Sequence, residues 1–111
     1  MYYINIYVIK NCGYSEKALK LLKGIKHKIV NVDYDKKYIY KNDDINTFPQ
    51  IYLKKNNSKG SLLIGGSDDL EFIINNIKKK IDIDSIYNIL KKKYKNWSKK
   101  AILRLIELIA K

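Results

Sequence analysis

The stretch YYINIYVIKNCGYSEKALKLLKG, residues 2–24, decides how the fold begins. Its first part, residues 2–9, is rich in β-branched and aromatic side chains, and its continuous apolarity predicts a strand buried on both faces. From Tyr14 onward the apolar side chains recur at helical spacing, and Gly24 is a typical place for that helix to end. A buried strand followed by a helix predicts an α/β fold.

The next segment predicts the rest of a small sheet. The alternation in HKIVNVD, residues 27–33, predicts a second strand, whereas the polar residues 35–46 predict only a short or irregular helix. Two apolar runs, FPQIYL at 48–53 and GSLLIG at 60–65, flank KKNNSK, whose asparagines and serine are typical of a hairpin turn. We therefore expect these two strands to pair antiparallel.

A second helix is predicted after the hairpin, in SDDLEFIINNIKKK at 67–80. Asp68 is expected to cap it, because Glu71 follows three residues later as in a capping box. Its apolar stripe is Leu70, Ile73, Ile74 and Ile77. The order of strands and helices predicts a small mixed sheet with helices packed on its faces.

The remaining residues, 82–111, predict a C-terminal helical extension. One helical face is expected to carry Ile83, Ile86, Tyr87, Leu90 and Tyr94. Ser98 can cap a last helix whose sequence AILRLIELIA is apolar nearly all round. Such a helix either packs within the chain or forms a dimer or partner surface, and we favour packing onto a domain formed by residues 1–81.

Composition and charge limit the possible functions. A chain of 111 residues suits one domain with a core of its own. Its net charge of +12 would attract polyanions, but no motif that reads nucleic acid accompanies the lysines, so we do not expect nucleic-acid binding. No apolar run approaches the roughly 20 residues that cross a bilayer, so we expect no membrane partner. A single cysteine and no secretory signal in MYYINIYVIK lead us to expect a cytoplasmic protein.

The single cysteine, Cys12, lies where the first helix is predicted to begin. Unpaired N–H groups and the helix dipole favour the thiolate at such a position, and thereby lower the pKa of the thiol. Gly13 leaves the sulfur accessible, and Lys10 can add positive potential. The alternative is a small buried side chain without chemistry, which is the commoner role of a lone cysteine.

Two further stretches bear on this choice. The only proline, Pro49, precedes a predicted strand, where a residue that cannot donate to the ladder normally occupies a special loop. Gly65 and Gly66 precede the N-terminus of a predicted helix, which suits the binding of a carboxylate. Taken alone, each stretch is more often just a turn.

Together, NCGYS, TFPQIYL and GGSDDL resemble three motifs of the glutaredoxin family, in the same order and at comparable spacing over residues 2–80. The resemblance implies a thioredoxin-like fold, with a four-stranded mixed sheet flanked by helices. It also implies that Pro49 is cis and stands opposite Cys12, and that the backbone of Phe48 pairs with the cysteinyl part of bound glutathione.

The same resemblance implies how the rest of glutathione is held. Ser67 and Asp68 would bind its γ-glutamyl end, and Lys10 is a candidate for its glycyl carboxylate. Tyr14 would line the rim. The lysine commonly lies three residues before the cysteine in this family, whereas here it lies two before, and Asn46 stands where a cation is frequent.

The resemblance leaves three functions open. The first is a monothiol oxidoreductase, because Ser15 replaces a second cysteine. Such a protein would remove glutathione from glutathionylated protein thiols by thiol–disulfide exchange. Ser15 either supports the Cys12 thiolate or lies on the helix surface.

The second is an iron–sulfur carrier, since Cys-Gly-Phe-Ser members share a [2Fe–2S] cluster in a dimer through two cysteines and two glutathiones. Cys12 would then be a metal ligand, and the protein is otherwise expected to be a monomer. The third is a redox-silent interaction module that uses the basic tail.

Overall fold

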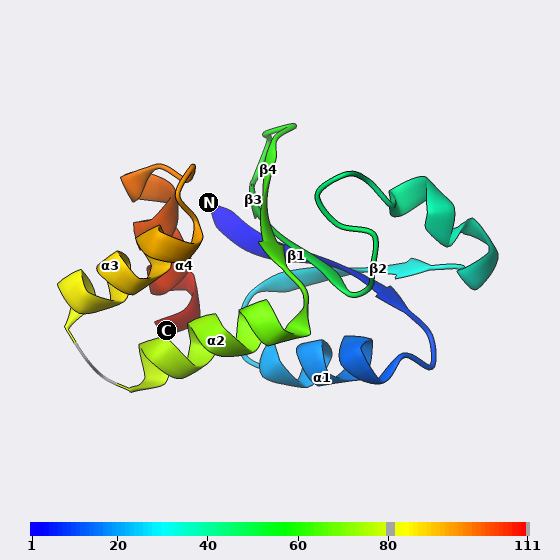
Figure 1. Ribbon diagram of the computed structural model, residues 1–111, viewed down its shortest axis with the longest axis horizontal. Helices are drawn as coiled ribbons and strands as arrows, with labels where there is room; N and C mark the ends of the chain where they lie inside the picture. Colours follow the sequence, from blue (N-terminus) through cyan, green and yellow to red (C-terminus); the bar gives the residue numbers. More distant parts are fainter. Residues whose placement is uncertain (80–81, 111) are drawn as a thin grey trace.

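The chain folds around a central four-stranded sheet with helices packed against it (Figure 1). The computed structural model describes residues 1–79 and 82–110. Its elements in chain order are β1 (Tyr2–Ile9), α1 (Gly13–Leu21), β2 (His27–Val32), the 3₁₀ helix η1 (Tyr34–Tyr40), β3 (Gln50–Lys55), β4 (Ser61–Gly65), α2 (Ser67–Lys78), α3 (Ile83–Lys93) and α4 (Lys99–Ala110). The boundary expected between residues 81 and 82 touches positions 80 and 81, which lie outside the described residues.

The strand order is β2-β1-β3-β4. Strand β1 runs parallel to β2 and antiparallel to β3, and β3 and β4 form the expected antiparallel hairpin. Parallel β1 and β2 require a crossover, which α1 provides. The mixed sheet flanked by helices confirms the thioredoxin-like α/β fold expected from the sequence.

Strand β1 lies in the interior of the sheet, as its continuous apolar sequence predicted. Ile4 and Ile6 are fully buried and lie opposite Leu53 and Ile51 of β3. Asn5, on the opposite face of the strand, is also buried. Both faces of β1 are therefore covered, which explains its continuous apolar sequence. A strand with one face in water would alternate apolar and polar residues instead.

Helix α2 packs beside α1, and its predicted apolar stripe is buried. Its start differs from the expectation. Gly66 is the N-cap residue, and the Asp69 carboxylate accepts a 2.9 Å hydrogen bond from the Gly66 N–H. Asp68 lies inside the first turn with its side chain 83% exposed, so its assignment as the cap was wrong. The cap lies two residues earlier than the sequence pattern suggested, at a glycine, which has no side chain of its own to accept a capping hydrogen bond.

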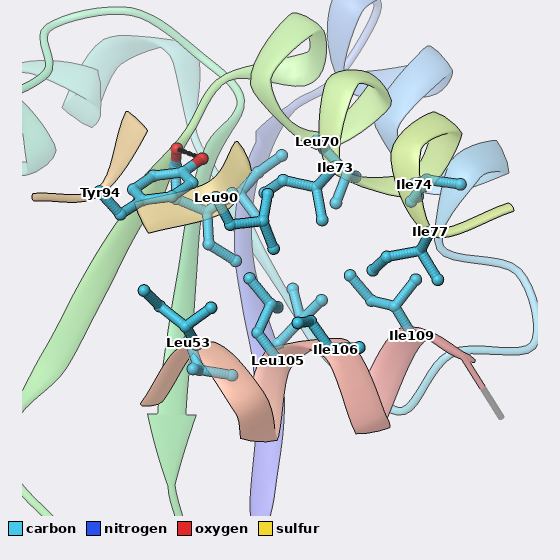
Figure 2. Packing of buried hydrophobic residues seen from close by; sticks show 14 of the residues in the cluster. Leu53, Leu70, Ile73, Ile74, Ile77, Leu90, Tyr94, Leu105, Ile106 and Ile109 are labelled. Atoms are coloured by element: carbon cyan, nitrogen blue, oxygen red, sulfur yellow. Dashed lines mark hydrogen bonds between the residues drawn. The ribbon is translucent and has the colours of Figure 1, made fainter. Parts of the chain in front are cut away.

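Helices α3 and α4 lie together at the end of the molecule away from η1 (Figure 1). Figure 2 shows side chains of α4, among them Leu105, Ile106 and Ile109, directed toward the buried stripe of α2. Ser98 caps α4 as expected, accepting a 3.1 Å hydrogen bond from the Ala101 N–H.

The residues expected on the apolar face of α3 differ in how far they are buried. Ile83, the first residue of the helix, is 55% exposed, whereas Ile86, Leu90 and Tyr94 are buried. An end residue has no preceding turn beside it, so helical spacing alone overstates its burial. Among the described residues, no helix combines the length and apolarity needed to cross a membrane.

Candidate functional site

Cys12 is the N-cap residue of α1, with extended backbone angles of φ −104° and ψ 118°. Its carbonyl oxygen accepts the first helical hydrogen bond, 3.0 Å from the Glu16 nitrogen. Asn11, immediately before it, has a positive φ of 62°, a conformation that asparagine tolerates better than most residues. This turn aims the cysteine at the N–H groups that begin the helix, with its side chain half-buried.

Opposing effects act on the pKa of the Cys12 thiol. Partial burial raises the pKa, but hydrogen bonds from the Ser15 side chain and from the backbone N–H groups of Ser15 and Tyr14 lower it. The charge of Glu16 opposes them weakly. The net pKa is lower than that of an ordinary thiol, which favours the nucleophilic thiolate.

Ser15 is well placed to stabilise that thiolate. It is only 2% exposed, so it is not the helix-surface serine that the sequence left open. Its oxygen also accepts a hydrogen bond from the Ile9 N–H at 3.3 Å, which ties the start of α1 to the end of β1. Because the Ser15 oxygen accepts from Ile9, the Ser15 hydroxyl proton is free to be donated to the Cys12 sulfur.

The loop that carries Pro49 faces the cysteine. The Phe48–Pro49 peptide bond is cis, as expected, and Pro49 is buried directly before β3. The Cys12 sulfur lies 4.0 Å from the carbonyl oxygen of Phe48. The backbone on either side of Phe48 is therefore within reach of a group bound to the sulfur.

A cavity of about 690 Å³ lies between this loop and the start of α2. That volume is within the roughly 300–1,000 Å³ usual for small-molecule sites. Its lining includes five of the residues that the sequence assigned to a site: Tyr14, Phe48, Pro49, Ser67 and Asp68.

The side chains of Tyr14, Ser67 and Asp68 are exposed to solvent to different extents. Tyr14 is 63% exposed, which suits a place at the rim. Ser67 is buried, whereas the exposed Asp68 carboxylate pairs with the Lys17 ammonium of α1 at 3.2 Å. The start of α2, whose first backbone N–H groups lack helical partners, therefore borders the cavity, and its first carboxylate is held toward α1.

Lys10 lies elsewhere. It is exposed and lines a second cavity together with Asn11, Ser15 and Tyr34. The structure thus separates Lys10 from the other five residues. A ligand centred between Phe48 and α2 would meet Lys10 only if it extended past Cys12.

Residues that the sequence did not single out also line the cavity between the Pro49 loop and α2. Lys93 and Tyr94 reach it from the end of α3, and Asp44 and Asp69 add two carboxylates. The Lys93 nitrogen lies 2.6 Å from an Asp69 oxygen, and the Tyr94 hydroxyl donates a 2.7 Å hydrogen bond to the Ile64 carbonyl. Only the packing of α3 brings Lys93 and Tyr94 to the site, so no local motif could reveal these two.

A metal site within one chain is not apparent. Across residues 1–79 and 82–110, no group of three or more His, Cys, Asp or Glu side chains is arranged to hold a metal ion. A cluster bound through Cys12 would need further ligands from a second chain and from glutathione.

Comparison with known proteins bears on this arrangement. Residues 4–56 match the family model described as Glutaredoxin. The matched region runs from β1 through β3 and contains both Cys12 and the cis-proline loop. The search of curated proteins found no match. Residues 4–56 therefore match a glutaredoxin domain within a thioredoxin-like fold, and this match supports glutathione-linked thiol–disulfide chemistry in general.

Proposed function

We propose that the protein is a glutathione-dependent monothiol oxidoreductase that reduces mixed disulfides between glutathione and protein thiols. The observation that carries the proposal is the setting of Cys12. The only thiol of the chain has a lowered pKa and lies 4.0 Å from the Phe48 carbonyl, beside a cavity of suitable size. A thiolate, not a thiol, is the attacking species in disulfide exchange.

The reaction needs two exchanges. The Cys12 thiolate attacks the glutathione sulfur of the mixed disulfide, forms a Cys12–glutathione disulfide, and releases the protein thiolate. The thiolate of a second glutathione then attacks the glutathione sulfur on Cys12. Oxidised glutathione leaves, Cys12 is regenerated as a thiolate, and glutathione is the overall reductant.

We assign the parts of the site as follows. The backbone of Phe48 beside Pro49 pairs with the cysteinyl part of glutathione, and the N–H groups of Ser67 and Asp68 bind its γ-glutamyl carboxylate. Tyr14 covers the rim. Lys10 would meet the glycyl carboxylate if the tripeptide extends past Cys12 toward the second cavity.

The test follows the release of thiol from a glutathionylated peptide, with glutathione as reductant. Wild-type protein should turn over, and Cys12→Ser should lose turnover while keeping the melting temperature of the wild type. A Cys12→Ser variant that retains full activity would contradict the proposal. Ser61→Ala, on the exposed edge of β4, serves as the matched control.

An iron–sulfur carrier is the second candidate, favoured by a half-exposed cysteine that is the only thiol of its chain. Two copies of Cys12 and two glutathiones would complete the four thiolate ligands of a [2Fe–2S] cluster. Reconstitution with iron, sulfide and glutathione should then give a coloured dimer. A colourless monomer favours the oxidoreductase, and a Cys12→Ala variant with unchanged partner binding favours a redox-silent module.

A further inference from the structure

The last turn of α3 forms one wall of the cavity between the Pro49 loop and α2. The Lys93 ammonium contacts one oxygen of Asp69 at 2.6 Å, and the other oxygen of Asp69 accepts the Gly66 N–H at 2.9 Å. Lys93 is therefore tied to the turn that begins α2. Its side chain is still 33% exposed, so part of it remains accessible to a ligand.

Lys93 is held in place by its neighbours. The next residue, Tyr94, is buried, and its hydroxyl donates to the Ile64 carbonyl at 2.7 Å (Figure 2). The Tyr94 ring packs against Trp97, with 4.7 Å between the ring centroids. The Lys93 nitrogen also lies 5.5 Å from the centre of the Phe72 ring. These contacts fix the end of α3 against β4 and α2, and the position of Lys93 with it.

The charges around the cavity make this lysine significant. Among the described residues that line the cavity, the acidic side chains are Asp44, Asp68 and Asp69, and Lys93 is the one cation. Lys17, which pairs with Asp68, lines a different hollow on α1. An anionic peptide entering so acidic a cavity needs a cation near its carboxylate.

We propose that Lys93 is a glutathione-binding residue that contacts the α-carboxylate of the γ-glutamyl group, so that the C-terminal extension completes the site of the glutaredoxin domain. This inference rests on the proposed function. An ammonium has three donors, so Lys93 can keep Asp69 and still donate to the ligand. The γ-glutamyl carboxylate is the group that Lys93 would meet, because Lys93 pairs with Asp69, whose carboxylate also binds the Gly66 N–H at the N-terminus of α2. The ligand's own ammonium finds an acceptor in Asp68.

The test is titration calorimetry of the full chain with reduced glutathione. Lys93→Met should weaken binding by roughly ten- to hundredfold, the range expected for one hydrogen bond to a charged group. Lys93→Arg should recover most of the affinity. Lys92→Met removes the same charge from an exposed neighbouring position and should leave affinity within about twofold, because screened surface charges contribute little.

A second ligand separates direct contact from an effect through Asp69. The analogue 4-aminobutyryl-cysteinyl-glycine lacks the α-carboxylate, so wild type should bind it more weakly than glutathione, and Lys93→Met should weaken it no further. An equal loss for both ligands would overturn the contact, and so would unchanged binding of glutathione by Lys93→Met. If wild-type protein binds no glutathione, the proposed function itself fails.

Discussion

The Cys12 sulfur and the Phe48 carbonyl oxygen lie 4.0 Å apart although 36 residues separate them in the chain. The sheet explains this approach. Because β1 and β3 are antiparallel neighbours, with Tyr7 opposite Gln50, the end of β1 and the start of β3 meet at one edge. The cysteine follows the first strand and the cis-proline precedes the other, so the central pair of strands brings Cys12 and the cis-proline loop together.

The reactivity of Cys12 should depend on pH in a defined direction. Alkylation by iodoacetamide is slow below the pKa, where the thiol is protonated, and fast above it. Since hydrogen bonds from Ser15 and Tyr14 outweigh the effect of burial and lower the pKa, the midpoint should lie below that of a free cysteine thiol measured in the same way.

Ser15→Ala should raise that midpoint, because it removes the side-chain hydrogen bond that lowers the pKa. Ser58→Ala, in the β3–β4 turn, is the control and should leave the midpoint unchanged. The same alkylation series measures both variants. An unshifted midpoint in Ser15→Ala would show that its hydroxyl does not support the thiolate.

Gly65→Ala should destabilise the protein by about 1–3 kcal/mol, measured by urea unfolding. Gly65 has a positive φ of 129°, and an added Cβ would collide with the Asp69 carboxylate. Gly13→Ala is the matched control, since its Cβ would meet no atom within 4 Å. Equal stability of the two variants would contradict the described turn.

Tyr94→Phe should lower the free energy of unfolding by about 0.5–1.5 kcal/mol, because the Ile64 carbonyl loses its buried donor. Burial, and less strongly the charge of Asp69, raises the pKa of Tyr94. Above about pH 10 the unfolded chain therefore loses this proton while the folded protein keeps it, and stability falls as pH rises.

The pH dependence provides a separate check on Tyr94. The phenylalanine variant should show a shallower loss of stability between pH 9 and 11 than the wild type, as measured by urea unfolding. Tyr38→Phe, at a residue 70% exposed, should leave the wild-type slope. If stability falls with pH as steeply in Tyr94→Phe as in the wild type, the wild-type Tyr94 hydroxyl must be exposed to water rather than buried.

Leu105→Ala should cost about 2–5 kcal/mol, since this fully buried side chain of α4 packs in the core cluster that includes the α2 stripe. Arg104→Ala, on the exposed side of the same helix, should cost less than about 1 kcal/mol, because it removes only a surface ion pair with Glu107. Urea unfolding measures both. Similar losses would mean that α4 does not share the core.

Periodicity and turn chemistry predicted most of the fold. The apolar run of β1, the turn in KKNNSK and the stripe of α2 were each read correctly, because each depends on residues close in sequence. The error occurs at a helix end. Asp68 was taken as the cap where Gly66 occupies it. Ile83 was placed on the apolar face of α3 without regard to its exposure, because neighbours distant in sequence decide how an end residue is covered.

The site was predictable only in part, for a related reason. Cys12, Pro49 and Ser67 lie in short motifs that can be read without a structure. Lys93 and Tyr94 lie in no motif, since a lysine run followed by tyrosine is an ordinary exposed pattern. Their place at the cavity depends on how α3 packs against β4 and α2, which is a tertiary contact.

Intact-mass spectrometry of the protein after mixing with a glutathionylated peptide tests the central claim most directly. Attack by the Cys12 thiolate on the glutathione sulfur predicts a protein that carries one glutathione on Cys12, together with free reduced peptide. A protein joined to the peptide, or one that stays unmodified under conditions that give full exchange with free thiols, would contradict the account.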